Sequence, residues 1–231
     1  TPSEPWDTVD RALLDTIANQ CCDDAEQRGI TGRPLAWRLA RRRIMKTARR
    51  FLATDMAIRA EYDVPPHGVE VAFGFDGSPP VSVTLGDGRQ VAFRGRIDRV
   101  DRSPDGARTV VFDYKTGTRR ELEDDPVAAG TSLQLPVYAH AAEALVPTTR
   151  ASAFYWYTQT AGVDALLGHD LDDCRERFTE VVTTIVDGID AGCFPAYPGE
   201  PRWQPFERRE SFRNCGYCAY DRLCPADRFS A

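Results

Sequence analysis

The pattern of hydrophobic and polar positions near the start of the chain predicts two helices. Residues 7–28 carry an apolar side chain at about every fourth position, and Gly29 ends this stretch. The predicted apolar stripe consists of Val9, Leu13, Ile17 and Cys21. A longer helix follows Thr31, with Pro34 in its first turn and Val64-Pro65-Pro66 at its end. Its predicted apolar face consists of Trp37, Ile44, Ala48 and Phe51.

The spacing of apolar residues then changes to the alternation that is typical of β-strands. Val69–Phe75 and Val81–Leu85 each carry an apolar side chain at every second position. The turn Gly86–Arg89 leads into a predicted strand at Gln90–Arg99, and a second turn precedes a strand at Thr109–Lys115. These segments predict an antiparallel meander.

The second half of the chain mixes both patterns. We expect a helix at about 132–145, an aromatic-rich strand at 152–158, a short strand near 165–168 and a helix at 171–190. The tail 194–231 is rich in proline, arginine and cysteine and shows little periodicity. Because helices come first, then strands, then helix–strand–helix, the fold class is α/β (α+β), in one domain.

That single domain, 1–231, divides into three predicted parts. They are a helical N-terminal part at 1–66, a sheet core at 67–193 and a cysteine-rich tail at 194–231. The chain begins Thr1-Pro2-Ser3 without a methionine, and we therefore expect a fragment of a longer protein.

Composition indicates a soluble protein: 42% of residues are hydrophobic and 28% are charged. No apolar run approaches the roughly 20 residues of a membrane span, and no signal segment opens the chain, so we expect a cytoplasmic protein. The net charge of −6 argues against a protein that coats nucleic acid indiscriminately. One predicted helix is nevertheless locally basic, and it is either a DNA contact or a solvated helix face. Its basic residues are Arg38, Arg41, Arg42, Arg43, Lys46, Arg49 and Arg50.

Two acids and a lysine near predicted strand ends are the candidate chemistry. Asp113 and Lys115 end one strand and share a face, because side chains alternate, while Tyr114 points away. Asp98 lies on the preceding strand and completes a set of oxygen ligands suited to Mg²⁺ or Mn²⁺. The set predicts metal-dependent phosphodiester cleavage, and the alternative is a group of salt bridges on the sheet rim.

Gln134 and Tyr138 are four residues apart on the predicted helix after these strands, so they share one helix face. An amide and a phenol that face the acids could hydrogen-bond a phosphate or stack on a base. The alternative is a polar pair on a solvated helix.

Together these motifs resemble the RecB-type branch of the PD-(D/E)xK nucleases. The resemblance implies a restriction-endonuclease-like core with a central mixed sheet and a Mg²⁺ or Mn²⁺ ion held by Asp98, Asp113 and the Tyr114 carbonyl. Lys115 would be catalytic, with Asp98 and Asp113, while Gln134 and Tyr138 would contact DNA. Such domains often accompany a helicase and process DNA ends, so DNA and a helicase domain or subunit are the expected partners.

Cys215, Cys218 and Cys224 have the compact spacing of a ligand set and resemble the tail of the AddB-type iron–sulfur subclass. That resemblance implies a [4Fe–4S] cluster whose fourth cysteine lies upstream, either missing from this chain or replaced by Cys22 or Cys21. Zn²⁺ is the competing metal, in a structural zinc-stapled interaction domain. The remaining cysteines, Cys174 and Cys193, are expected to be core thiols.

The chain departs from the family pattern at one position of the metal site. The family carries a histidine on an early helix beside the metal, whereas the only histidine before Asp98 is His67, which follows two prolines. The alternative function is therefore an inactive DNA-end-binding module that retains the fold and the metal cluster.

Overall fold

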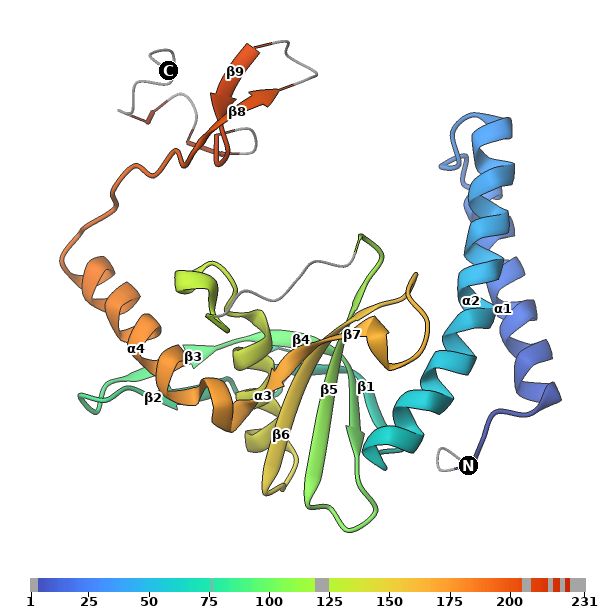
Figure 1. Cartoon of the computed structure of the whole chain (residues 1–231), viewed down its shortest axis with the longest axis horizontal. Helices are drawn as coiled ribbons and strands as arrows, with labels where there is room; N and C mark the ends of the chain where they lie inside the picture. The colour runs from blue at the N-terminus through green and yellow to red at the C-terminus, as the bar shows by residue number, and fades with distance from the viewer. Residues whose placement is uncertain are drawn as a thin grey trace. The chain divides into compact units, whose positions relative to one another are not determined.

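The computed structural model describes residues 4–75, 77–118, 125–204, 209–215, 218–220 and 223–224 of the chain. The chain divides into two compact units, residues 1–183 and 184–231, and the first contains the sheet core (Figure 1). Among the described helices, none combines the length and apolar character needed to cross a bilayer.

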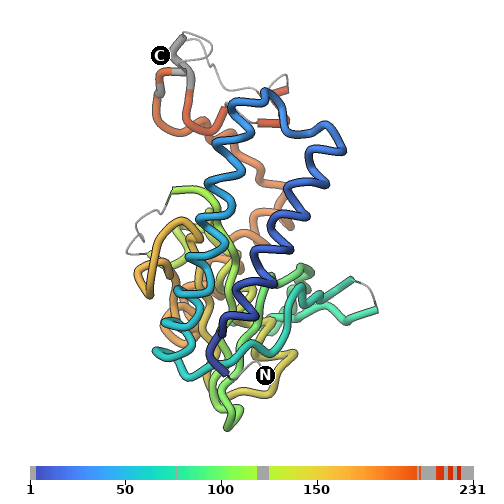
Figure 2. The backbone as a smooth tube through the Cα atoms, turned by 90° about the vertical axis from the view of Figure 1, so that its right-hand side faces the viewer, coloured from blue at the N-terminus to red at the C-terminus, as the bar shows by residue number. Residues whose placement is uncertain are grey.

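Helices α1 (Thr8–Gln27) and α2 (Pro34–Tyr62) form a long hairpin, in which they run side by side (Figure 2). The start of α1 is fixed by Asp7, whose carboxylate accepts hydrogen bonds from the backbone N–H groups of Val9 and Asp10. The Asp10 carboxylate accepts a bond from the Asp7 N–H, which completes a capping box. Pro34 occupies the first turn of α2, where its missing N–H costs no helical hydrogen bond.

The core sheet has five strands in the order β1-β4-β5-β6-β7. They are β1 (Pro66–Phe73), β4 (Gly95–Arg102), β5 (Arg108–Lys115), β6 (Arg150–Tyr157) and β7 (Leu166–Asp170). Neighbouring strands are antiparallel except for β5 and β6, which are parallel and joined through η1 (Ala128–Gly130) and α3 (Gln134–Leu145). The short helix η2 (Val163–Ala165) and helix α4 (Leu171–Asp190) flank β7 in the sequence. These elements confirm the expected α/β class, with a mixed sheet flanked by helices.

The two faces of this sheet belong to different hydrophobic clusters. Val111 of β5 is buried in one cluster with residues of α3, while its neighbours Val110 and Phe112 are buried in the other with Ile58 of α2. Strand alternation produces this division, because adjacent side chains project to opposite faces. Helix α3 therefore covers one face, and the C-terminal half of α2 covers the other.

The predicted strand Gln90–Arg99 is wrong as a single element. Strand β3 (Gln90–Phe93) pairs only with β2 (Val81–Thr84) in a separate two-stranded sheet, and β4 begins after Arg94. At the break, a Cβ on Gly95 would lie 2.7 Å from the Phe73 ring, so this close approach requires glycine. The predicted meander is consequently interrupted by a small hairpin.

The predicted apolar stripe of α1 is also wrong as a packing surface. Val9, Leu13 and Ile17 are 71%, 56% and 46% exposed. Helix α1 meets α2 through a different side, which carries the buried Cys22 and the hydrogen-bonding Asn19. The periodicity identified the helix correctly but not the face that packs.

The second unit has little regular structure among its described residues. Strands β8 (Pro201–Gln204) and β9 (Arg209–Phe212) pair as an antiparallel two-stranded sheet. Cys215 and Cys218 follow in the sequence, and the Cys218 N–H donates to the Cys215 carbonyl over 3.2 Å.

Candidate active site

Asp98 and Asp113 lie on adjacent antiparallel strands. The antiparallel register pairs Arg99 of β4 with Phe112 of β5. Asp98, which precedes Arg99, therefore lies opposite Asp113, which follows Phe112. Residues opposite each other in this way project to the same face. The Tyr114 N–H donates to Asp98 Oδ2 over 2.8 Å, which holds the Asp98 carboxylate against β5.

Lys115 and Gln134 complete a connected polar group around Asp113. The Lys115 ammonium forms an ion pair with Asp113 Oδ2 and also donates to Gln134 Oε1 over 3.2 Å. Gln134 in turn donates from Nε2 to Asp113 Oδ1 over 2.9 Å and to the Tyr138 hydroxyl over 3.2 Å. The structure therefore brings Asp98, Asp113, Lys115, Gln134 and Tyr138 together at the β5 end that faces α3.

The electrostatics of this group are unbalanced. Asp113 is only 5% exposed, and burial raises its pKa, with the Asp98 charge adding to the rise and Lys115 opposing it. Burial also works against the charge of Lys115, yet the hydrogen bond and charge of Asp113 leave the lysine pKa raised. Among the described residues, Lys115 pairs with Asp113 and Asp98 has no ion pair, so the group carries a surplus negative charge, which the burial of Asp113 makes costly.

The oxygen atoms of this group fit a hard divalent cation as metal ligands. Asp113 Oδ2 is buried and, among the described residues, accepts no hydrogen bond apart from its ion pair with Lys115. Asp98 and Asp113 supply carboxylate oxygens, and the Tyr114 carbonyl is the further oxygen predicted from the sequence. Oxygen-only ligands of this kind suit Mg²⁺ or Mn²⁺ better than zinc or copper.

Sequence reasoning missed Tyr155 as part of this group. The parallel register pairs Asp113 of β5 with Tyr155 of β6, and the Lys115 ammonium lies 4.7 Å from the Tyr155 ring centroid. Alternation within the aromatic run Phe154–Tyr157 contained the signal, because Phe154 and Trp156 pack on the α2 face and leave Tyr155 on the other.

The opposite face of β4 and β5 carries a second charged group that the sequence analysis also missed. Asp55 of α2 contacts the guanidinium groups of Arg99 at 2.5 Å and Arg59 at 3.0 Å. Arg99 also binds Asp101 with two hydrogen bonds of 2.6 Å. Tyr114 projects to this side, as predicted, and its ring packs against Phe51 and Trp156.

No histidine joins the candidate metal ligands within the described ranges. His67 is exposed on β1 rather than on a helix, and none of its described contacts reaches Asp98 or Asp113. His140 is packed against Phe178 of α4, at a ring-centroid separation of 5.2 Å, and burial lowers its pKa to about 4.

The cysteines do not form a ready metal site within the described part of the chain. No group of three or more His, Cys, Asp or Glu side chains there is arranged to hold a metal, and Cys215, Cys218 and Cys224 are among the described residues. Cys22 is buried in the helical hairpin, whereas Cys21 is exposed. Cys174 is a core thiol as expected, but Cys193 is exposed, so its predicted burial was wrong.

Comparison with known proteins identifies relatives over most of the chain. The family model of the PD-(D/E)XK nuclease superfamily matches residues 3–225. A protein of Symbiobacterium thermophilum, named as a subunit of an ATP-dependent helicase/deoxyribonuclease, is 36% identical over 166 residues, which are 66% of this chain and 13% of that protein. The protein of the same name from Clostridium tetani is 29% identical over 143 residues, 59% of this chain and 12% of that protein.

This chain therefore spans about an eighth of the length of these curated relatives. A solved structure described as the crystal structure of SSO0001 aligns with 93% of this chain and 85% of its own, at 16% sequence identity. Its TM-score of 0.33 is too low to support an argument about the fold. The family model, by contrast, covers nearly the whole chain, and the chain belongs to the PD-(D/E)XK nuclease superfamily.

Proposed function

We propose that this chain is the nuclease domain of a DNA-end-processing enzyme and hydrolyses phosphodiester bonds with Mg²⁺ or Mn²⁺. The observation that carries the proposal is the surplus negative charge of the buried Asp113 and the half-buried Asp98, for which Lys115 is the one described ion-pair partner. A purely structural ion-pair group would balance its charges, whereas a cation-binding group needs an excess of carboxylate. The superfamily membership supports the same interpretation.

Asp98, Asp113 and the Tyr114 carbonyl would hold the divalent cation. When bound, such an ion polarises the scissile phosphate and lowers the pKa of a bound water. The Tyr114 N–H positions the Asp98 carboxylate, and Gln134 orients both Asp113 and Lys115 through its amide. Lys115 keeps its proton and would donate it in a hydrogen bond to a phosphate oxygen as negative charge develops there.

We further propose that the domain works beside a helicase domain or subunit on DNA. The relatives named above are helicase/deoxyribonuclease subunits, and this chain matches only a small part of each. Gln134 and Tyr138 border the acids, so a strand that enters the site would pass over the start of α3.

The test is degradation of single-stranded and blunt-ended DNA with Mg²⁺ or Mn²⁺. We expect Asp113→Asn to remove metal-dependent cleavage. Asp164 is an exposed carboxylate outside the site, so Asp164→Asn should cleave normally. Chelation with EDTA should abolish cleavage by the wild type and by Asp164→Asn. Cleavage that survives in Asp113→Asn would contradict the proposed active site.

An inactive DNA-end-binding module is the second candidate, and the lack of a described histidine beside the acids favours it. In that case the native chain would bind DNA ends without cutting them in either metal. The same cleavage assay, combined with a binding assay on end-labelled DNA, therefore separates the two functions.

The [4Fe–4S] cluster stays a prediction from the spacing of Cys215, Cys218 and Cys224. Iron, acid-labile sulfide and zinc measured on anaerobically purified protein will distinguish it from a structural zinc site. Protein that contains neither metal would rule out both, and the nuclease proposal does not depend on the result.

A further inference from the structure

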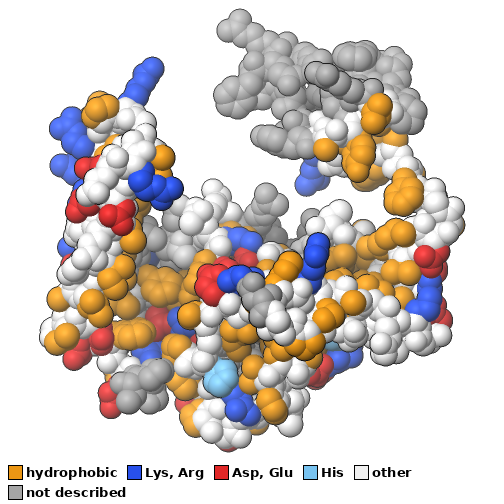
Figure 3. All heavy atoms as spheres, turned by 180° about the vertical axis from the view of Figure 1, so that it is seen from behind, with side chains coloured by type: hydrophobic (Ala, Val, Ile, Leu, Met, Phe, Trp, Pro, Cys, Tyr) orange, Lys and Arg blue, Asp and Glu red, His pale blue; other side chains and the backbone are white. Residues whose placement is uncertain are grey.

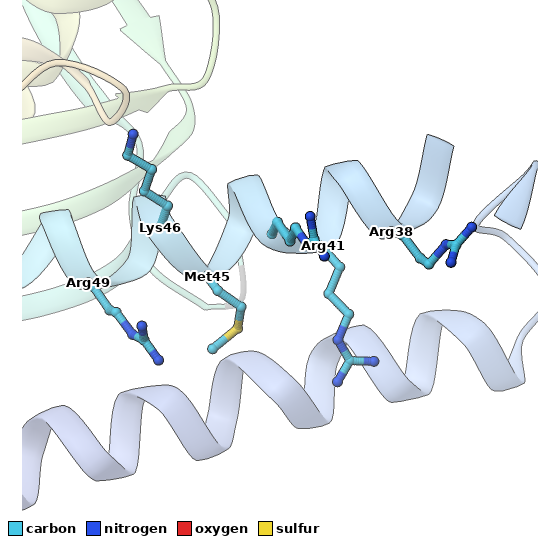
Figure 4. Close-up of a pocket in the computed structure, with 6 residues that line it drawn as sticks. Arg38, Arg41, Met45, Lys46 and Arg49 are labelled. Carbon is cyan, nitrogen blue, oxygen red and sulfur yellow. The ribbon is translucent and has the colours of Figure 1, made fainter. Parts of the chain in front are cut away.

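We propose that one face of α2 binds the phosphate backbone of the DNA strand that enters the Asp98–Asp113 site. This basic face consists of Arg38, Arg41, Arg42, Lys46 and Arg49, which together with Met45 line a hollow of about 540 Å³ (Figure 4). The inference rests on the proposed nuclease function and adds a second contact surface for its substrate, away from the cutting site.

The charge of α2 is exceptional for this protein. The chain as a whole has a net charge of −6, yet residues 38–50 contain seven basic residues and no acidic residue. Lys and Arg side chains accordingly gather on the helical hairpin in the space-filling view (Figure 3). A concentration of one sign within an acidic protein indicates a surface for a partner of the opposite charge.

Helix α1 neutralises only part of this charge. Arg41 contacts Asp23 at 2.6 Å and Glu26 at 2.9 Å, and Arg49 contacts Asp15 at 2.9 Å. These pairs hold the two helices of the hairpin together, and they account for the structural part of the basic segment.

Arg38, Arg42 and Lys46 are exposed and have no ion pair with any residue in the described ranges. Their four-residue spacing places them in one row on the helix, with successive residues about 6 Å apart along its axis. Like charges at this spacing repel one another. A polyanion on the row would remove that repulsion, and the row, about 12 Å long, would meet three or four phosphates of one strand.

The basic face leads to the strand end that carries Lys115. Phe51, which follows the face along α2, stacks on Trp156 with ring centroids 4.5 Å apart, which anchors α2 to the sheet. Arg50 donates to the carbonyl of Gln159, and the Gln159 amide donates to the Thr116 carbonyl over 2.5 Å. Thr116 directly follows Lys115, so two hydrogen bonds connect the helix with the edge of the candidate active site.

Figure 4 shows how the side chains divide between two directions. Arg41 and Arg49 extend toward α1, where their acidic partners lie, whereas Lys46 extends toward the sheet. A DNA strand along the unpaired row would consequently pass the Lys46 side chain on its way to Lys115.

The test compares two double variants of the whole chain with equal loss of charge. Arg42→Gln with Lys46→Gln removes two unpaired charges from the basic face. Arg11→Gln with Arg43→Gln is the matched control, because both arginines are exposed on the same hairpin but do not line the hollow. Glutamine has nearly the helix propensity of arginine and lysine, so both variants should fold. Circular dichroism checks this.

Binding to fluorescein-labelled oligothymidylate is measured in EDTA over a range of salt concentrations, so that no cleavage intervenes. Two lost phosphate contacts should reduce the slope of log affinity against log salt by about 1.4 for a single strand. We expect this reduction in Arg42→Gln/Lys46→Gln and the wild-type slope in the control. In cleavage assays the same face variant should show a raised KM for long DNA.

The proposal is overturned if the face variant keeps the wild-type slope of log affinity against log salt. It is also overturned if the face variant and the control lose this slope equally. The result is independent of the cutting chemistry, because binding in EDTA does not require the metal. Failure to cleave DNA, with the slope still reduced in the face variant, would reject the nuclease function and support the binding surface. Cleavage that depends on Asp113, together with an unchanged salt slope in the face variant, would support the nuclease function and reject the binding surface.

Discussion

The two faces of the β4–β5 strand pair differ in how their buried charges are matched. On the face toward α2, Asp55 and Asp101 are completely buried, and each contacts at least one guanidinium group, from Arg59 or Arg99. Two acids meet two arginines, and the Trp6 indole donates a further hydrogen bond to Asp55 at 2.5 Å. This group is neutral overall, and its geometry fixes α2 against the sheet.

On the face toward α3, Asp113 forms an ion pair with Lys115, whereas Asp98 has no ion pair among the described residues and accepts only the Tyr114 N–H. Gln134 satisfies one oxygen of Asp113 but adds no charge. In terms of charge, the same strands therefore carry a saturated group, with two acids and two arginines, on one side and an unsaturated group, with two acids and one lysine among the described residues, on the other. A charge that folding leaves unmatched is available to a ligand, and this difference separates the structural acids from the candidate catalytic ones.

The largest expected effect comes from breaking the saturated group. Asp55→Ala should lower the free energy of unfolding by about 3–5 kcal/mol, because Arg99 would keep a buried charge with one partner fewer. Urea denaturation measures the loss. Asp15→Ala is the control, since it removes a solvent-exposed ion pair with Arg49 and should cost much less. A similar loss in the free energy of unfolding for both variants would show that the buried ion pairs of Asp55 stabilise the fold no more than an exposed ion pair does.

A smaller effect is expected from the uncharged member of the unsaturated group. Gln134→Ala should weaken Mn²⁺ affinity and cleavage roughly 10- to 100-fold, because groups that orient metal ligands typically have effects of this size. Isothermal titration with Mn²⁺ gives the affinity. Tyr138→Phe keeps the ring and removes only the hydroxyl that Gln134 contacts, so it should change metal affinity little.

If Gln134→Ala weakens only DNA binding and leaves Mn²⁺ affinity unchanged, Gln134 serves the substrate alone, as the sequence motif suggested. The hydrogen bonds of Gln134 to both Asp113 and Lys115 favour the orienting role over that purely DNA-binding one.

A variant of His140 tests whether a buried group outside the two charged groups also makes the stability of the protein depend on pH. Burial lowers its pKa to about 4 from the usual 6.5, and the Arg175 charge adds to this, opposed by Glu143. Between these values the unfolded chain binds the proton more readily, so stability should fall as the pH drops from about 6.5 to 4, by roughly 1–2 kcal/mol. Denaturation of His140→Gln across this range should lose that part of the pH dependence. An unchanged profile would mean that folding does not lower the pKa of His140.

The smallest expected change is a gain in stability on replacing Asp113, the buried acid of the candidate site. Because the pKa of Asp113 is raised, its ionised form destabilises the metal-free protein at neutral pH, and this cost shrinks as the pH falls. Asp113→Asn should therefore raise the melting temperature slightly in EDTA. Mn²⁺ should raise the melting temperature of the wild type, through binding to the folded state, but not that of the variant. A lower melting temperature for the variant in EDTA would place Asp113 among the structural acids.

The helices and most strands of this protein could be predicted from the sequence because their signals are local. The capping residue Asp7, the proline in the first turn of α2 and the alternation of β5 each act within a few residues. The break between β3 and β4 was missed, since it depends on the Phe73 ring of another strand lying against Gly95. For the same reason the exposure of Val9, Leu13 and Ile17 could not be foreseen.

The sequence by itself determined which residues could perform the chemistry: the spacing of Asp98, Asp113 and Lys115 restricts them to neighbouring strand ends, and alternation restricts Asp113 and Lys115 to one face. Only the tertiary structure decided which charges remain unmatched. Alternation puts Asp98 and Asp101, three residues apart on one strand, on opposite faces, but it does not say which face has its charge matched: α2 brings arginine contacts to one face and α3 brings an amide to the other. Charge matching depends on long-range packing, and local sequence patterns do not contain that information.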